Sequence, residues 1–199
     1  MAARVDHAVT SGTFSLDGET FDVDNNVWVV GDERECVVID APHSVPEILK
    51  VVDGRKVVAI VLTHAHDDHV RVAPELAERT GAPLLLHPAE EVLWELTHAG
   101  VPMPAPLADG QEVTVGGVTL KVLHTPGHSP GAICLYAPAL GCVFTGDTLF
   151  QGGPGATGRS YSDRPTIEQS IRDRLLSLPP ATVVHTGHGD DTTIGAEQF

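Results

Sequence analysis

Cysteine is scarce in this sequence, which has only three among 199 residues. Cys36, Cys134 and Cys142 lie in apolar runs with no CxxC spacing, so we expect buried free thiols and no disulfide framework. The lack of disulfides is typical of a reducing compartment. No apolar run approaches the ~20 residues that a membrane helix needs, and the N-terminus lacks the apolar stretch of a signal peptide. We therefore predict a cytoplasmic protein.

Basic residues are also few, since Lys and Arg number 12 against 27 Asp and Glu, which gives a formal net charge of -15 at pH 7. Nucleic acid and anionic membranes would be repelled, so we expect neither as a partner. The 42% of hydrophobic and 20% of charged residues are ordinary for a globular protein and argue against disorder. The length suits one domain, 1–199, and the sequence leaves the oligomeric state open.

Strand and helix patterns alternate along the chain. Runs rich in Val and Ile predict strands, and apolar spacings of three and four with Ser, Pro or Gly at the ends predict helices. We expect short strands in the first forty residues, including 25–32 and 35–42, and later strands at 56–62, 82–87, 112–125 (a hairpin about Gly116 and Gly117), 131–138, 141–148 and 181–191. The expected helices are 44–54, 70–81, 88–100 and 165–178, with loops at 101–110 and 151–160. This order predicts an α/β fold with two mixed sheets and helices outside, a four-layer α/β/β/α sandwich.

The densest polar group is the run THAHDDH at 63–69, directly after the apolar strand 56–62. Three imidazoles and a carboxylate packed into six residues there would be costly without a partner. Divalent ions such as Zn²⁺ supply one, because they bind neutral imidazole and carboxylate. Alternate residues of an extended turn face one side, so we expect His64 and His66 to lie together. Asp68 and His69 can then turn towards a second ion.

Three more candidate ligands follow other predicted strands: His128 in HTPGHSPG, Asp147 in TGDT and His188 in HTGHG. Each alone is a weak signal, because a single histidine at a strand end is more often structural than ligating. Together with the run at 63–69 they favour one site, since the strand ends of open sheets gather ligands. The other histidines are interpreted as structural, namely His7, His43, His87, His98, His124 and His185.

The motif set HxHxDH followed by His, Asp and His resembles the metallo-β-lactamase superfamily, from about residue 20 to the C-terminus. Within that superfamily the sequence is most similar to short members of the hydroxyacylglutathione hydrolase (glyoxalase II) group. The resemblance implies two divalent metal ions, zinc foremost and iron or manganese otherwise. It implies that one ion lies on His64, His66 and His128 and the other on Asp68, His69 and His188, with Asp147 bridging them.

The resemblance also bears on the reaction. Asp40, in VVIDAP, matches a position that supports the ligands. Many true metallo-β-lactamases have cysteine where this chain has Asp147, so a bridging carboxylate points instead to relatives that cleave thioesters and esters. A hydroxide held by two ions would attack the carbonyl, and Asp68 would also act as a catalytic residue that orients this nucleophile. Arg159 is a candidate for binding an acidic substrate group, with a structural salt bridge as the alternative.

We therefore expect an enzyme that hydrolyses a small-molecule thioester or related acyl ester of a small thiol. Only residues 189–199 follow His188, so we expect the helical extension that helps full-length glyoxalase II to bind glutathione to be lacking. Three alternatives stay open. They are a persulfide dioxygenase with one iron on His64, His128 and Asp147, a lactone or β-lactam hydrolase on the same scaffold, and a non-enzymatic metal buffer or interaction module.

Overall fold

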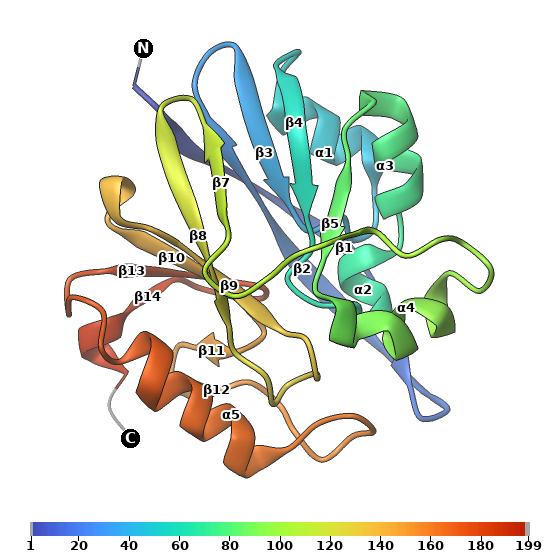
Figure 1. Ribbon diagram of the computed structural model, residues 1–199. Helices are drawn as coiled ribbons and strands as arrows, with labels where there is room; N and C mark the ends of the chain where they lie inside the picture. The colour runs from blue at the N-terminus through green and yellow to red at the C-terminus, as the bar shows by residue number, and fades with distance from the viewer. Residues whose placement is uncertain (1, 198–199) are drawn as a thin grey trace.

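The computed structural model describes residues 2–197 as two β-sheets that face each other, with helices on both outer sides (Figure 1). One sheet has the strand order β1-β2-β3-β4-β5-β6 and the other β14-β13-β10-β9-β8-β7, while β11 and β12 pair separately. The predicted four-layer α/β/β/α sandwich is confirmed. Residues 1, 198 and 199 of the expected domain 1–199 lie outside the described residues.

The first sheet begins with a hairpin of two 13-residue strands, β1 (Arg4–Leu16) and β2 (Glu19–Gly31). The expectation of short strands is wrong here, because the pairing continues unbroken from Arg4 opposite Gly31 to Leu16 opposite Glu19. Asp17 and Gly18 form the turn with φ of 56° and 77°, the left-handed conformation that tight hairpins favour for Asp-Gly. The sheet continues with β3 (Glu35–Ile39), β4 (Lys56–Val61), β5 (Leu84–Leu86) and β6 (Ala105–Pro106), the last inside a segment expected to be a loop.

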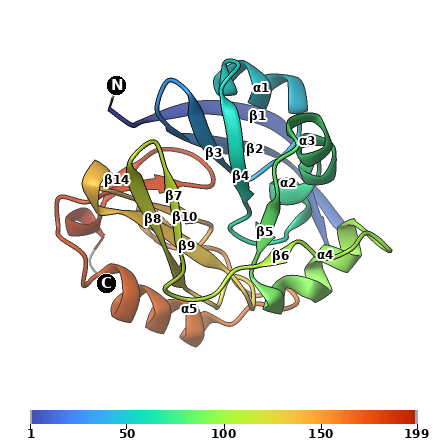
Figure 2. The ribbon, with the colours of Figure 1, turned by 45° about the horizontal axis from the view of Figure 1, so that its top comes forward.

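Helices α1 (Val45–Val52) and α3 (Ala73–Thr80) lie on the outer face of the first sheet (Figure 2). Ser44 caps α1 as expected, and its hydroxyl accepts a hydrogen bond from the N–H of Glu47. The expected helix 70–81 is wrong in extent. It is replaced by α2 (Asp67–Val70) and α3, because Pro74 lacks the N–H needed to continue a helix and stands in the first turn of α3. The expected helix 88–100 consists of a 3₁₀ turn, η1 (Pro88–Glu90), and α4 (Glu91–Thr97).

The second sheet carries the later part of the chain. The hairpin expected about Gly116 and Gly117 joins β7 (Glu112–Val115) to β8 (Val118–His124). The other strands are β9 (Ile133–Ala137), β10 (Cys142–Gly146), β13 (Val183–Thr186) and β14 (Thr192–Thr193). The short strands β11 (Leu149–Phe150) and β12 (Gly153–Pro154) precede α5 (Arg164–Ser170), which runs into a π-helical turn, η3 (Ile171–Leu175). Two further 3₁₀ turns occur in this half: η2 (Pro138–Leu140) lies between β9 and β10, and η4 (Ile194–Ala196) follows β14.

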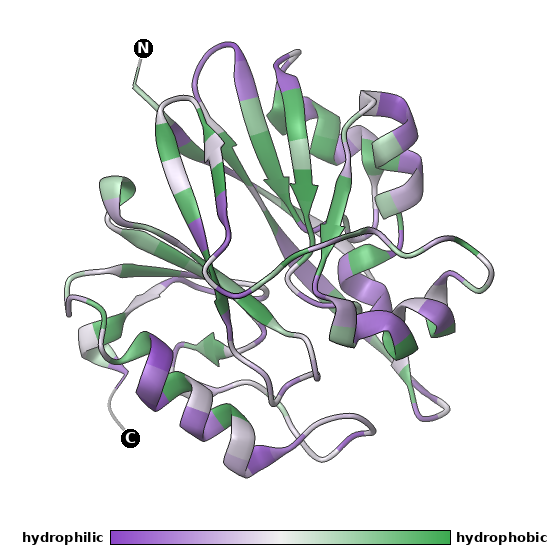
Figure 3. Ribbon diagram, viewed as in Figure 1, coloured by the Kyte–Doolittle hydropathy of each residue, from purple (hydrophilic) through white to green (hydrophobic). Residues whose placement is uncertain are grey.

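The alternation of side chains along β2 explains the four layers. Val27 and Val29 point into a core between the first sheet and its helices, whereas Trp28 and Val30 point into the core between the sheets. Because successive residues of a strand face opposite sides, an apolar run of this kind must be covered on both faces. A third core lies between the second sheet and α5 with its π-helical turn. Hydropathy mapped on the ribbon shows the sheet strands as mostly apolar and the helices as two-faced (Figure 3).

The three cysteines are free and buried, as expected. Burial raises the pKa of Cys134 to about 11, so this thiol is not ionised at neutral pH. No helix within residues 2–197 is both long and apolar enough to cross a membrane.

We predict that the substitution Phe144→Ala lowers the free energy of unfolding by about 3–5 kcal/mol, because it leaves a cavity in the core between the sheets. Phe144 is fully buried there and packs against Trp28 and His185. The measurement is chemical denaturation of both proteins. Leu96→Ala is the control, since Leu96 is 62% exposed, and its stability should change little. Equal losses in the two variants would contradict this account of the core.

Candidate metal centre

The predicted ligands converge where strands of both sheets end. His64 and His66 lie between β4 and α2, while Asp68 and His69 belong to α2 itself. His128 comes after β8. Asp147 directly follows β10, and His188 is the second residue after the end of β13. The separation of α2 from α3 therefore matters for the site, because it turns Asp68 and His69 inward on a short helix of their own.

Three overlapping groups of side chains could each hold a metal ion in the described part of the chain. Within each group the ligand atoms lie within 4.8 Å of one another. The groups are His64, His66 and His128, then His64, His69 and Asp147, and finally Asp68, His69 and His188. The first and the third are the two sets expected from the sequence, and the second lies between them. None of the six histidines interpreted as structural belongs to a group among residues 2–197.

The carboxylate of Asp147 touches both sets. Its Oδ1 atom lies 3.2 Å from Nε2 of His69, and its Oδ2 atom lies 3.3 Å from Nε2 of His188. The same Oδ2 atom is 3.6 Å from Nε2 of His128. Between the sets, Nε2 of His128 is 3.0 Å from Nδ1 of His66, and the Nε2 atoms of His69 and His188 are 3.2 Å apart. This carboxylate is placed where one side chain can contact two ions.

The chemistry of these side chains fits divalent cations. Nε2 of His64, Nε2 of His66 and Oδ1 of Asp147 are buried and make no hydrogen bond within residues 2–197. Buried polar atoms are costly unless they are paired, and a cation would pair all three. Burial holds the pKa of His64 well below its ordinary value and lowers that of His66 to about 3, so both rings are neutral, as metal ligation requires.

The carboxylates give the centre an excess of negative charge. Burial opposes the charged form of His188, but Asp147 and Asp68 outweigh it and raise the pKa of His188 to about 10. The same two aspartates raise the pKa of His69 well above its ordinary value, also against burial. A carboxylate-rich pocket that binds protons this tightly calls for positive charge, which divalent ions supply.

Hydrogen bonds behind the ligands orient their rings. Asp40, which follows β3, accepts hydrogen bonds on Oδ1 from the N–H of Thr63 (2.7 Å) and on Oδ2 from the Thr63 hydroxyl (2.8 Å). Its Oδ2 atom is also 2.8 Å from Nδ1 of His69, which leaves Nε2 of that ring for the centre. In the same way Nδ1 of His128 donates to the carbonyl of Ala156, and Nδ1 of His188 donates to the carbonyl of Asp24. Such partners fix the tautomer and direction of a metal-binding imidazole.

Two residues at the site were missed from the sequence. Glu90, fully buried at the end of η1, accepts hydrogen bonds from the N–H of Ala65 (2.7 Å) and from the N–H of Gly131 (2.6 Å). It thus joins the segment that carries His64 and His66 to the segment that carries His128. In PAEE it looks like an ordinary surface glutamate. Asn25 contacts Asp68, His69 and His188, and its only signal is a polar residue at the start of an apolar strand.

Arg159 lies beside the centre, and its guanidinium already has a partner. It lines a small cavity of about 70 Å³ together with His66 and His128. Its Nη1 atom is 2.8 Å from Oε2 of Glu19, and the guanidinium stacks on Phe21 at 4.8 Å from the ring centre. The salt bridge expected as the alternative for this residue is present, and substrate contact stays a prediction.

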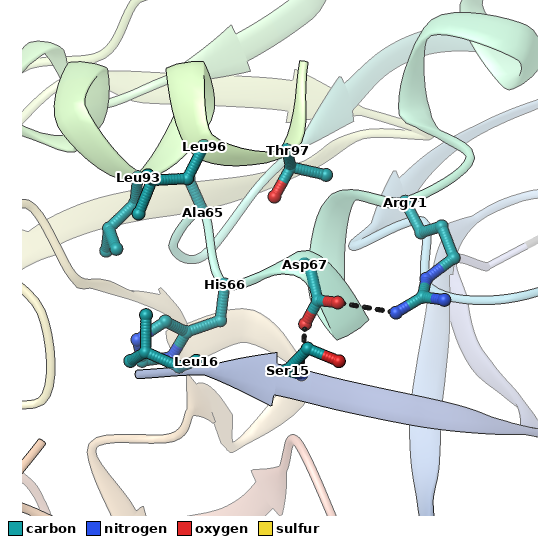
Figure 4. Close-up of a pocket in the computed structure, with 9 residues that line it drawn as sticks. All are labelled: Ser15, Leu16, Ala65, His66, Asp67, Arg71, Leu93, Leu96 and Thr97. Atoms are coloured by element: carbon teal, nitrogen blue, oxygen red, sulfur yellow. Dashed lines mark hydrogen bonds and ion pairs between the residues drawn. The ribbon is translucent and has the colours of Figure 1, made fainter. Parts of the chain in front are cut away.

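A larger pocket of about 400 Å³, also lined by His66, opens between α2, α4 and the end of β1 (Figure 4). Leu16, Leu93 and Leu96 give it an apolar wall. Asp67 and Arg71 also line the pocket and pair with each other. The second dashed line is the hydrogen bond that the N–H of Ser15 donates to Asp67. The pocket can therefore take a small group that is partly apolar and carries little net charge.

We predict that Glu90→Gln destabilises the protein by about 1–3 kcal/mol, because the new amide N–H₂ must face a backbone N–H donor. The matched control is Glu91→Gln, which changes an exposed side chain on the next residue. The measurements are the free energy of unfolding and the number of metal ions retained per chain. Equal behaviour of the two variants would show that Glu90 does not join the two ligand segments.

We predict that Gly187→Ala reduces metal binding. A Cβ atom at this position would lie 2.2 Å from Oδ1 of Asp147 and 2.9 Å from Cε1 of His69, so the carboxylate would have to move. The expected result is a lower metal content after dialysis against the same buffer, measured by elemental analysis. Full retention of metal at wild-type affinity would contradict the tight approach of this backbone to Asp147.

The comparisons with known proteins agree with this geometry. Residues 20–188 match the model of the family described as "Metallo-beta-lactamase superfamily". Hydroxyacylglutathione hydrolase GloC of Haemophilus influenzae is 32% identical over 187 residues, which cover 86% of this chain and 87% of that protein. The crystal structure of the BLEG-1 B3 metallo-β-lactamase is 30% identical to this chain, with a TM-score of 0.78. The match covers 94% of this chain and 95% of the BLEG-1 chain. The crystal structure of TTHA1623 in a di-iron-bound form is 35% identical to this chain, with a TM-score of 0.76. The match covers 94% of this chain and 96% of TTHA1623. The chain belongs to the metallo-β-lactamase superfamily, as a metallo-hydrolase.

Proposed function

We propose that this protein hydrolyses a thioester or related acyl ester of a small thiol at a pair of divalent metal ions. The observation that carries the proposal is the position of Asp147, whose two oxygens contact ligands of both candidate sets. An ion on each set would share this carboxylate. The similarity to a hydroxyacylglutathione hydrolase supports the acyl-thioester class, and the similarity to a di-iron protein supports two ions and leaves iron beside zinc and manganese.

When bound, two such ions supply a hydroxide nucleophile at neutral pH and polarise the carbonyl oxygen. The side chains of the protein position these events. His69 and His188 present Nε2 to the centre because their Nδ1 atoms are engaged by Asp40 and by the carbonyl of Asp24. Asp68 has a pKa lowered to about 2, since its contacts with His69, His188 and Asn25 outweigh the effect of burial. It is therefore ionised at neutral pH and can orient the nucleophilic water by accepting its proton in a hydrogen bond.

The two cavities beside His66 provide room for the ends of such a substrate. The larger pocket, with Leu16, Leu93 and Leu96, would receive one of the two parts that the reaction separates. The smaller one, with Arg159, would receive an acidic group only if that group competes with Glu19 for the guanidinium. We therefore propose an uncharged or weakly acidic substrate rather than a strongly anionic one.

A second candidate function is β-lactam hydrolysis, which the similarity to a B3 metallo-β-lactamase favours. The same ions and orienting side chains would serve an amide carbonyl in a strained ring. Asp147 weighs towards thioester cleavage, because many true metallo-β-lactamases have cysteine at that position. The persulfide dioxygenase remains a distinct outcome of the test, since it needs one iron and consumes oxygen.

We predict about two divalent ions per chain in protein purified without added metal, in line with two-metal hydrolases. Elemental analysis gives the number, and a panel of a glutathione thioester, an N-acetylcysteamine thioester, a lactone and a β-lactam gives the reaction. Removal of metal by a chelator should abolish thioester hydrolysis, and zinc, iron or manganese should restore it. Asp147→Ala should lower both metal content and turnover.

Three results would contradict the proposed thioester hydrolysis, and each points to a different conclusion. A single iron per chain with oxygen uptake on a glutathione persulfide would replace the hydrolase by a dioxygenase. Fast opening of the β-lactam or lactone with negligible thioester turnover would move the proposal to those substrates. Full metal content and activity in the Asp147→Ala variant would remove the observation on which the proposal rests.

A further inference from the structure

Asn25 occupies the wall of the centre next to the third group of ligands. It is completely buried in β2. Its amide nitrogen Nδ2 lies 2.9 Å from Oδ2 of Asp68, 3.3 Å from Nε2 of His69 and 3.5 Å from Nε2 of His188. A single neutral side chain thus reaches all three members of the set that would hold the second ion.

The orientation of this amide is fixed from behind by His43. Nε2 of His43 lies 2.7 Å from Oδ1 of Asn25. A carboxamide oxygen only accepts hydrogen bonds, so this imidazole nitrogen must carry the hydrogen. With Oδ1 engaged in this way, the N–H₂ group faces Asp68. The reverse orientation would bring two oxygens, Oδ1 of Asn25 and Oδ2 of Asp68, against each other and would leave two N–H donors facing on the other side.

The surrounding chain makes room for this arrangement. The ring of His43 lies against Gly12 of β1, where a Cβ atom would come within 2.2 Å of Nδ1 of His43. The other ring nitrogen, Nδ1, is buried and has no hydrogen-bond partner within residues 2–197, so the only hydrogen bond of the ring is the one to Asn25. His43 thus packs against the one residue of β1 without a side chain and forms one hydrogen bond within residues 2–197, so we infer that it is placed for its contact with Asn25.

We propose that Asn25, oriented by His43, is a positioning residue for the second metal ion. Its N–H holds Oδ2 of Asp68, the oxygen that lies 3.5 Å from Nε2 of His69 and 3.3 Å from Nε2 of His188, so that the carboxylate keeps one rotamer directed at the second ion. Within residues 2–197 no hydrogen bond joins Asn25 to the first group, His64, His66 and His128, so its ion should be independent of this pair. The inference rests on the two-metal centre of the proposed function and is independent of the substrate.

The test is a two-step metal titration of metal-free full-length protein with Co²⁺ and with Zn²⁺ in competition with a chelator. Visible absorption of Co²⁺ reports the coordination of each step. In Asn25→Leu, which has a similar size but no N–H, we expect second-ion affinity to fall about 10–100-fold, the range typical of residues that support metal ligands. First-ion affinity should stay within the error of the wild-type value. Thermal unfolding of the metal-free variant checks that it folds.

Two variants of His43 keep the test informative if Asn25→Leu does not fold. His43→Ala leaves the amide of Asn25 free to rotate, so the second ion should bind more weakly and its Co²⁺ spectrum should change. His43→Gln restores an N–H donor towards Oδ1 of Asn25 and should recover most of the affinity. Recovery by Gln and not by Ala separates a hydrogen-bond role from simple filling of space.

The failures of the two proposals are distinguishable. If the wild-type protein binds fewer than two ions, the two-metal centre itself is wrong. If the wild type binds two ions and the Asn25 and His43 variants bind both with unchanged affinities, only the positioning role is wrong. Equal weakening of the first and the second ion in these variants would also overturn it, because the effect would then be general to the fold.

Discussion

The contacts of the Asp40 carboxylate hold together the parts from which the metal centre is built. One side chain joins the end of β3 to Thr63 at the end of β4 and to His69 on α2. Asp40 itself has a φ of 65°, a left-handed conformation that is unfavourable for a residue with a Cβ atom. Such a strained conformation costs about 1–3 kcal/mol, and it persists only where surrounding contacts hold the backbone dihedral angles in place. The three hydrogen bonds to a charged acceptor provide those contacts.

A second constraint follows from the burial of so much charge. Asp68 and Asp147 lie among five imidazoles at the meeting edge of two apolar cores, where unpaired charge is expensive. The protein reduces this cost from outside, through Asp40, Asn25, Glu90 and backbone carbonyls. Within residues 2–197, Nε2 of His64, Nε2 of His66 and Oδ1 of Asp147 have no hydrogen-bond partner. Stability and metal binding are thus linked, because an ion bound only by the folded state stabilises that state.

The sequence predicted the parts of this protein whose signals are local. The run THAHDDH, the apolar strands and the α/β/β/α order all follow from residues close together in the chain. Glu90 and Asn25 could not be found in that way, because their roles depend on hydrogen-bond partners 25 and 43 residues away. The helix expected at 70–81 shows a different limit: its apolar spacing is genuine, but Pro74 and the turn of Asp68 and His69 towards the centre divide it. Tertiary contacts override periodicity where the chemistry lies.

The spread of the ligands along the chain has a consequence for biosynthesis. The first sheet contributes ligands up to His69, but Asp147 and His188 follow strands of the second sheet and are synthesised later. The N-terminal half can pair its long hairpin early, since those contacts are local. Its buried carboxylates and imidazoles must nevertheless wait for β10 and β13 before they can be enclosed. Enclosure of the candidate ligands therefore depends on synthesis of the second sheet, and until then the ligands from the first sheet form an open, acidic half-site.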